Sequence, residues 1–194
     1  MSKLWGCADL PHGCRYPEVE WVDEDGMTCA DPMTFICQIR LQDIAAYDSE
    51  NLLPHTGMLY FFADIDYFLG NLEADSPGMG QWDKDRYCVL YAPETEHLDT
   101  HRIVCEDGTA FGLPAQEMSF THCKERADGF KLLGKPYFEE TEEEYPHYIS
   151  LLHLDCNDDW RLQFYDCGML NFLITPEDLA ARKWEQAICH LHSF

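Results

Sequence analysis

Basic residues are scarce in this sequence. Its 194 residues include 13 Lys and Arg against 36 Asp and Glu, which gives a formal charge of −23 at pH 7. A surface this acidic repels the phosphates of nucleic acids and of anionic lipids, so it argues against binding to either. The same surface attracts basic partners and speeds their encounter, although acidic residues can also serve solubility alone.

Long apolar runs and local signatures of catalysis are missing as well. No stretch approaches the ~18 apolar residues of a bilayer span, and the first residues lack the apolar centre of a signal peptide. There is no Gly-rich phosphate loop, no Gly-x-Ser-x-Gly elbow, and none of the ten cysteines forms a Cys-x-x-Cys pair. We therefore expect a cytoplasmic protein with reduced thiols. The sequence identifies no cofactor, no metal site and no catalytic residue; it favours a protein that is not an enzyme and leaves that question open.

A repeated apolar run indicates how the chain is organised. The run Gly-Met-Leu-Asn-Phe-Leu at 168–173 has a near-copy, Gly-Met-Leu-Tyr-Phe-Phe, at 57–62. Each run follows another apolar segment, at 149–155 and 34–41, and continuous apolarity is typical of strands buried on both faces. The pattern predicts two related halves, although coincidence between two apolar strand pairs is the alternative.

The rest of the chain fits a single α+β domain, 1–194, that is dominated by mostly antiparallel strands and has a few short helices. We expect an irregular N-terminal arm at 1–33, a first half at about 34–113 and a second half at about 130–194. Further strands are expected at 87–91, 101–105, 160–165 and 187–192, and helices at 42–47, around 122–127 and from Pro176 to near Trp184. The acidic block 139–144 is expected to be a solvated loop or a helix end.

Two polar residues hold corresponding places in the two halves and are candidates for ligand binding. Gln38 lies in the apolar segment before the first run, and His153 lies in the segment before the second. A polar group inside a buried strand needs a partner, which either the backbone or a ligand can supply.

Four further candidates come from acidic and aromatic positions. Asp155 and Asp166 flank one expected hairpin, where carboxylates can hold a divalent cation or simply stabilise the turn. Trp82 and Trp160 can line a groove, although aromatic residues in such segments more often belong to the core.

Six segments in order resemble the YwqG-like family, also called DUF1963. They are Gly-Cys-Ala-Asp-Leu-Pro-x-Gly-x-x-Tyr-Pro at 6–17, Phe-x-x-Gln-Ile-x-Leu at 35–41, Leu-Leu-Pro-x-x-Gly-x-Leu-Tyr-Phe-Phe at 52–62, Leu-Leu-Gly-x-Pro at 132–136, Leu-Leu-x-Leu-Asp at 151–155 and Asp-x-Gly-Met-Leu-x-Phe at 166–172. The sequence departs from the family pattern at Ala8, Tyr16, His153 and Asn171, where the family has proline, tryptophan, glutamine and an aromatic residue. The resemblance implies a compact α+β protein with antiparallel strands and internal duplication. Some family members are encoded near bacterial toxin systems, which implies an immunity-type role as one option.

Charge and resemblance together favour one function. The expected function is that of a non-catalytic, acidic, cytoplasmic binding protein that recognises a basic protein partner, and neutralisation of a bacterial toxin is one form of it. The alternative is a small-ligand-binding or metal-binding protein, or an enzyme, that uses a cleft between the two halves. Oligomeric state and partner identity stay open.

Overall fold

The chain forms two compact units that alternate along the sequence. The computed structural model describes residues 1–105 and 108–194. Unit 1 contains Met1–Asp64 and Asp85–Phe120, and unit 2 contains Ile65–Lys84 and Thr121–Phe194. The segment 65–84, expected in the first half, is therefore part of unit 2, and each unit is described below by itself.

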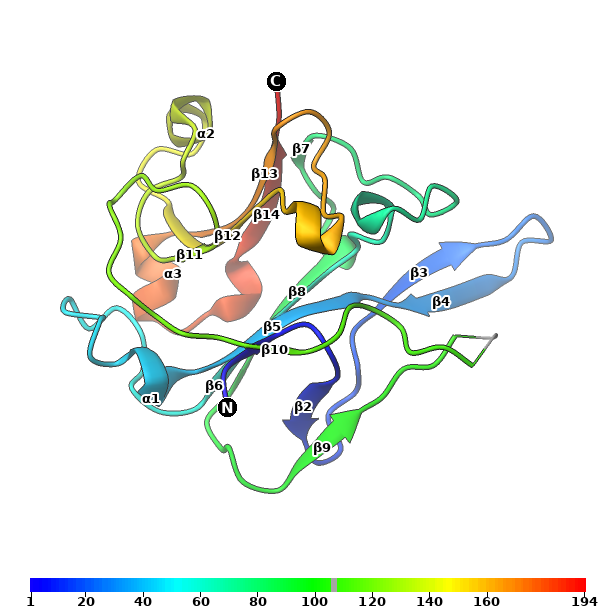
Figure 1. Ribbon diagram of the computed structural model, residues 1–194, viewed down its shortest axis with the longest axis horizontal. Helices are drawn as coiled ribbons and strands as arrows, with labels where there is room; N and C mark the ends of the chain where they lie inside the picture. The colour runs from blue at the N-terminus through cyan, green and yellow to red at the C-terminus, as the bar shows by residue number, and fades with distance from the viewer. Residues whose placement is uncertain (106–107) are drawn as a thin grey trace. The chain divides into compact units, whose positions relative to one another are not determined.

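Unit 1 is built on a five-stranded antiparallel sheet (Figure 1). In spatial order its strands are β10 (Gln116–Glu117), β1 (Lys3–Leu4), β5 (Thr34–Arg40), β6 (Met58–Ala63) and β8 (Tyr87–Ala92). The central strands β5 and β6 bury all but one of their residues, since both carry continuous apolar sequence. The unit also has the short helix α1 (Leu41–Ile44) and two separate ribbons, β2 (Ala8–Pro11) with β9 (Leu98–His101) and β3 (Glu18–Val22) with β4 (Thr28–Pro32).

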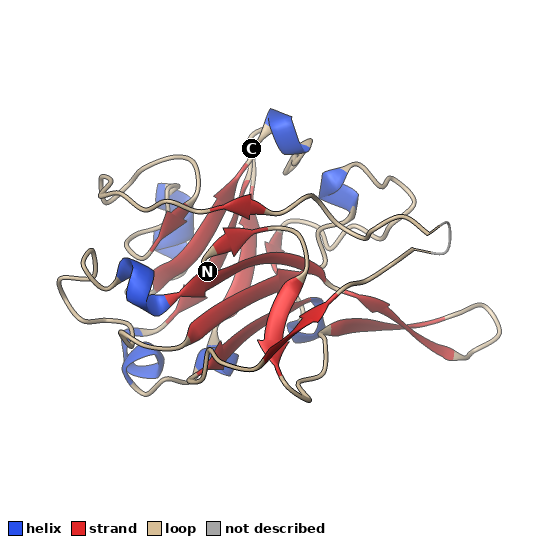
Figure 2. Cartoon of the chain, turned by 60° about the horizontal axis from the view of Figure 1, so that its bottom comes forward, coloured by secondary structure: helices blue, strands red, loops and turns tan. Residues whose placement is uncertain are grey.

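Unit 2 repeats the five-stranded antiparallel plan, and strands dominate the whole cartoon in Figure 2. Its strands, in spatial order, are β11 (Lys131–Leu132), β12 (Ile149–Asp155), β13 (Met169–Ile174), β14 (Ile188–His192) and β7 (Gly80–Gln81). Its helices are α2 (Glu139–Glu144) and α3 (Pro176–Ala180). Helix α3 begins as expected, because the Thr175 hydroxyl accepts a hydrogen bond from the Asp178 N–H at 3.1 Å and Pro176 takes the first helical position.

The two sheets match in register as well as in order. The strand pairs β5–β6 and β12–β13 each contain one register shift, at Ile36 and at Leu151. The carbonyl of Ile36 accepts a hydrogen bond from the Trp5 N–H at 2.8 Å, and the carbonyl of Leu151 accepts one from the Leu133 N–H at 3.2 Å. Both donors have left-handed backbone, with φ of 56° and 59°. The duplication therefore extends to the segment Lys-Leu-x-Gly, which occurs at 3–6 and again at 131–134.

Glycine is required at the start of the second strand in both halves. A Cβ on Gly57 would lie 2.5 Å from the carbonyl oxygen of Ala92, and one on Gly168 would lie 2.6 Å from that of His192. Ala92 and His192 hold the same register position, opposite Met58 and Met169. The backbones approach so closely at both places that no side chain fits between them.

The strands with continuous apolar sequence are confirmed by the structure. The expected segments 34–41, 57–63, 149–155 and 168–174 correspond to β5, β6, β12 and β13. Mostly antiparallel β structure with a few short helices and two related halves is thus the fold of this chain. The acidic block 139–144 is helix α2.

Other expected elements differ from the structure. Residues 1–33 are not irregular but contain β1 to β4, because Gly and Pro there lie in turns or at the ends of short strands. The segment 160–165 is no strand, since the Arg161 backbone is left-handed at φ 53°. The strand expected at 101–105 is displaced: β9 ends at His101, and beyond it Val104 forms an isolated antiparallel bridge with Ala110. Residues 122–127 have no helix. Helix α3 ends at Ala180, close to the left-handed Arg182.

The α-helices within the described residues contain four to six residues each. Within residues 1–105 and 108–194, none of them has the length and apolarity that a membrane span needs.

Replacing Gly168 by Ala tests the close backbone approach. The added Cβ would lie 2.6 Å from the carbonyl oxygens of His192 and Phe164, so we expect Gly168→Ala to lower the free energy of unfolding by about 2–4 kcal/mol in urea denaturation. The matched control is Gly26→Ala, where φ is +80° but no atom lies within 4 Å, and backbone strain alone should cost about 1 kcal/mol. Equal losses in the two variants would contradict the close-approach argument.

Candidate functional site

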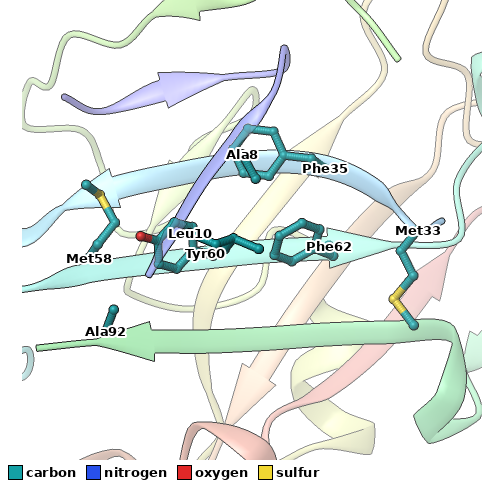
Figure 3. Packing of buried hydrophobic residues seen from close by; sticks show 8 residues of the cluster. All are labelled: Ala8, Leu10, Met33, Phe35, Met58, Tyr60, Phe62 and Ala92. Atoms are coloured by element: carbon teal, nitrogen blue, oxygen red, sulfur yellow. The ribbon is translucent and has the colours of Figure 1, made fainter. Parts of the chain in front are cut away.

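A row of polar side chains crosses the sheet of unit 1. Gln38 on β5 is fully buried and lies between Lys3 on β1 and Tyr60 on β6, which are its directly opposite neighbours. Directly opposite residues share a face of the sheet, so the three side chains are on the same side. Strand β2 crosses over this face, as Figure 3 shows for Leu10 above Tyr60.

Asp9 of β2 gathers the polar groups of this row. Its N–H donates to Gln38 Oε1 at 2.9 Å, and its carbonyl accepts from the Tyr60 hydroxyl at 2.7 Å. Its Oδ2 accepts from Lys3 Nζ at 2.7 Å and from Gln38 Nε2 at 2.9 Å, while Oδ1 accepts from the Thr100 hydroxyl at 2.7 Å. The buried amide, the ammonium and the carboxylate therefore satisfy one another.

These contacts also set the charge of Asp9. Partial burial by itself would raise the pKa of the carboxyl, but hydrogen bonds from Lys3, Thr100 and Gln38 outweigh it and hold the pKa below its usual value. Asp9 is consequently a carboxylate at neutral pH, and Lys3 balances its charge.

A cavity of about 370 Å³ opens beside Asp9 and Gln38. It lies wholly in unit 1. Its lining comes from the chain start, β2, β5, β6, the segment before β9 and β9 itself: Met1, Asp9, Gln38, Arg40, Met58, Thr95, Glu96 and Leu98. Its volume falls in the range of about 300–1,000 Å³ that small-molecule sites occupy. The cavity joins a satisfied polar cluster to two exposed charges, Arg40 and Glu96.

The equivalent row in unit 2 has different chemistry. Lys131, His153, Asn171 and His190 are directly opposite one another across four strands, and all four are buried. Lys131 Nζ donates to two backbone carbonyls, those of Glu125 at 2.6 Å and Lys135 at 2.7 Å. Burial lowers the pKa of Lys131. Backbone carbonyl oxygens thus accept the hydrogen bonds of the Lys131 ammonium, as the Asp9 carboxylate does for Lys3 in unit 1.

His153 is the least satisfied group of that row. Neither ring nitrogen has a hydrogen-bond partner in the described part of the chain; the backbone of Gly129 and Ala127 faces the ring and favours its protonated form without reaching hydrogen-bond geometry. Burial lowers the pKa of His153 to about 4, and the nearby Lys131 ammonium adds to this effect. The imidazole is therefore neutral at pH 7.

The two candidate aspartates lie in unit 2 and differ in their surroundings. Asp155 Oδ2 accepts a hydrogen bond from the Gly129 N–H at 2.9 Å, and Oδ1 accepts one from the Cys156 N–H at 2.8 Å, so its carboxylate fixes the adjoining backbone. The Asp166 side chain is exposed, and its carbonyl accepts from Gln163 Nε2 at 2.8 Å. Among the residues described, no group of three or more His, Cys, Asp or Glu side chains could hold a metal ion.

The two candidate tryptophans pack against aromatic rings of unit 2. Trp82 is 3% exposed, lies parallel to Phe68 with ring centres 6.0 Å apart, and donates its indole N–H to the Gly78 carbonyl at 2.8 Å. Trp160 meets Phe130 edge-to-face at 4.9 Å. Trp82 therefore belongs to the core, and Trp160 is a partly buried packing residue.

The structure thus places Gln38 in unit 1 and the other five candidates in unit 2. It brings Gln38 together with Tyr60, and with Lys3 and Asp9, which sequence reasoning did not select. Their signal is present in retrospect: the repeated Lys-Leu-x-Gly segment contains Lys3, and the family-like segment at 6–17 contains Asp9.

Comparison with protein families supports the same duplication. The profile of a domain of unknown function (DUF1963) matches residues 2–128 and, a second time, residues 106–192. The chain belongs to the DUF1963 family. Each of the two DUF1963 matches covers one of the related sheets' central strands, β5–β6 or β12–β13, which agrees with their shared register. No curated protein matches the chain.

Removing the Gln38 amide tests the polar cluster. Gln38→Leu leaves the Asp9 N–H and part of its carboxylate without a partner under β2, so we expect the free energy of unfolding to fall by about 2–3 kcal/mol in urea denaturation. Gln42→Leu, at an exposed position of α1, is the matched control and should change it by less than about 0.5 kcal/mol. A Gln38→Leu variant as stable as the control would show that the cluster contributes little.

His153 should make stability depend on pH. Between its ordinary pKa near 6.5 and its folded pKa of about 4, the unfolded chain binds more protons, so the free energy of unfolding falls as pH drops through this window. The difference between these two pKa values corresponds to about 3 kcal/mol in the free energy of unfolding. In urea titrations from pH 7 to pH 4, His153→Gln should lose this part of the slope, whereas His12→Gln, at an exposed ring, should keep it. Superimposable profiles for His153→Gln and the unmodified chain would contradict the assignment.

Proposed function

We propose that this chain is a non-catalytic, acidic, cytoplasmic binding protein that recognises a basic protein through the β3–β4 ribbon of unit 1. The observation that carries the proposal is a two-stranded arm with exposed apolar and acidic side chains. Figures 1 and 2 show the arm extending away from the end of β5.

Apolar side chains are exposed along the ribbon and at its tip. Trp21 is 46% exposed, Val22 66% and Met27 65%. The Trp21 indole N–H donates to Asp31 Oδ2 at 2.7 Å, which fixes one ring across the two strands. Exposed aromatic and Met side chains are the residue types that protein interfaces enrich and bury.

The same ribbon is the most one-sidedly charged part of unit 1's strands. Residues 18–32 contain six acids and no Lys or Arg: Glu18, Glu20, Asp23, Glu24, Asp25 and Asp31. A partner with a basic surface gains attraction at long range and can bury the apolar side chains at contact. This complementarity favours a basic protein over a neutral or acidic one.

The outer edges of the ribbon also present backbone N–H and C=O groups for hydrogen bonding. Strands β3 and β4 pair only with each other in the described sheets. An edge of this kind is a template on which a partner strand can add, which gives main-chain hydrogen bonds as well as side-chain contacts. Neutralisation of a basic bacterial toxin is the specific form of this function that the family resemblance suggests.

Two charge-matched variants test the ribbon as the contact surface. The first combines Glu20→Gln, Glu24→Gln and Asp25→Asn, and it removes three exposed charges from the ribbon. The second removes three exposed charges from helix α2 by changing Glu139, Glu140 and Glu143 to Gln. Both variants and the unmodified chain are used for affinity purification from lysate of the source cells at low salt, with identification by mass spectrometry.

We expect a basic protein that the unmodified chain and the α2 variant retain equally, and that the ribbon variant retains at least about tenfold less well. Its recovery should fall as salt is raised. Equal loss of retention in both variants would show that net charge, and not the ribbon, determines binding. Recovery of no basic protein at low salt would refute the proposed function.

A further inference from the structure

The cavity beside Asp9 and Gln38 is lined by two oppositely charged side chains that form no ion pair within the described residues. Asp9, one of its lining carboxylates, is balanced by Lys3 at 2.7 Å. Arg40 and Glu96 also line the cavity, and in residues 1–105 and 108–194 neither side chain takes part in an ion pair. A guanidinium and a carboxylate are therefore both available at one cavity.

Apolar and polar surfaces complete the lining. The partly buried Leu98 supplies apolar surface, and it packs against the apolar cluster seen in Figure 3, in which Met58 is 1% exposed. Gln38 Nε2 uses its two hydrogens on Asp9 Oδ2 and on the Met1 carbonyl, whereas Oε1 receives only the Asp9 N–H. Gln38 is fully buried, so its part is to hold Asp9 at the wall of the cavity.

We propose that this cavity binds a small zwitterion of amino-acid size. Its carboxylate pairs with the Arg40 guanidinium, its ammonium pairs with the Glu96 carboxylate, and its apolar side chain lies on Leu98, beside the buried Met58. The volume of about 370 Å³ suits a ligand of this size.

The net charge of the chain favours a zwitterion over a simple anion or a simple amine as the ligand. A net anion would meet the field of a chain with formal charge −23, which opposes its approach to Arg40. A simple amine would be attracted but would leave the Arg40 guanidinium without a counter-charge. A zwitterion has no net charge to repel and gives each group its partner. This inference is independent of the β3–β4 ribbon, since no ribbon residue lines the cavity.

Ligand binding is measured by isothermal titration calorimetry with the full chain and each of the twenty L-amino acids. Apolar members such as L-leucine are expected to bind. Two analogues separate the charges: 4-methylpentanoate lacks the amine of leucine, and 3-methylbutylamine lacks its carboxylate. We expect each analogue to bind at least about tenfold more weakly than leucine.

Variants locate the site. Arg40→Gln and Glu96→Gln should each weaken binding about tenfold, whereas Arg102→Gln and Glu50→Gln, at exposed positions of the same unit, should leave it within about twofold. Methyl resonances of Met58 and Leu98 should shift in NMR spectra on titration, which reports the site even if a variant folds poorly. The proposal is overturned if no amino acid binds, if either analogue binds as well as leucine, or if the resonances that shift lie elsewhere.

Discussion

The double hydrogen bond between Gln38 and Asp9 is the contact on which the architecture of unit 1 depends. A fully buried amide in an apolar strand is tolerated only if its polar atoms find partners. Here Asp9 of the crossing strand β2 supplies two of them, and the Met1 carbonyl supplies the third. The contact fixes β2 over β5 and β6, and β9 follows because it pairs with β2. The wall of the cavity is therefore a consequence of satisfying one buried glutamine.

The second unit solves the same problem in another way. Lys131 and His153 occupy the register positions of Lys3 and Gln38, but the lysine bonds backbone carbonyls and the histidine is kept neutral by burial. The duplicated backbone has thus been kept while its polar centre has diverged. In unit 2 the carboxylate of Glu144 contacts this row at its far member, His190, 3.3 Å from Nε2, and not at the position that matches Gln38. Equivalent positions in the two sheets therefore differ in their chemistry.

The strands that are buried along their whole length were predictable from their continuous apolar sequence. The strands that exist only through pairing with a neighbour were not. Strands β6 and β13 are buried along their whole length, so their apolar runs were visible. Strands such as β1 and β11 have two residues each and exist only because a neighbour pairs with them. At the site, the matched positions of Gln38 and His153 were predictable from spacing. The bond from Gln38 to Asp9 was not, because it joins residues 29 apart through a crossing of strands that no local pattern encodes.

The alternation of the two units along the chain constrains how they can be separated. Unit 2 takes its edge strand β7 from residues 65–84, which the chain passes through before it returns to β8, β9 and β10 of unit 1. A single breakpoint therefore always leaves one sheet incomplete: a break after Phe120 removes β7 from unit 2, and a break after Asp64 removes β8 from unit 1. Neither unit can therefore be cut out with a complete sheet at one breakpoint, although the two sheets share a strand plan.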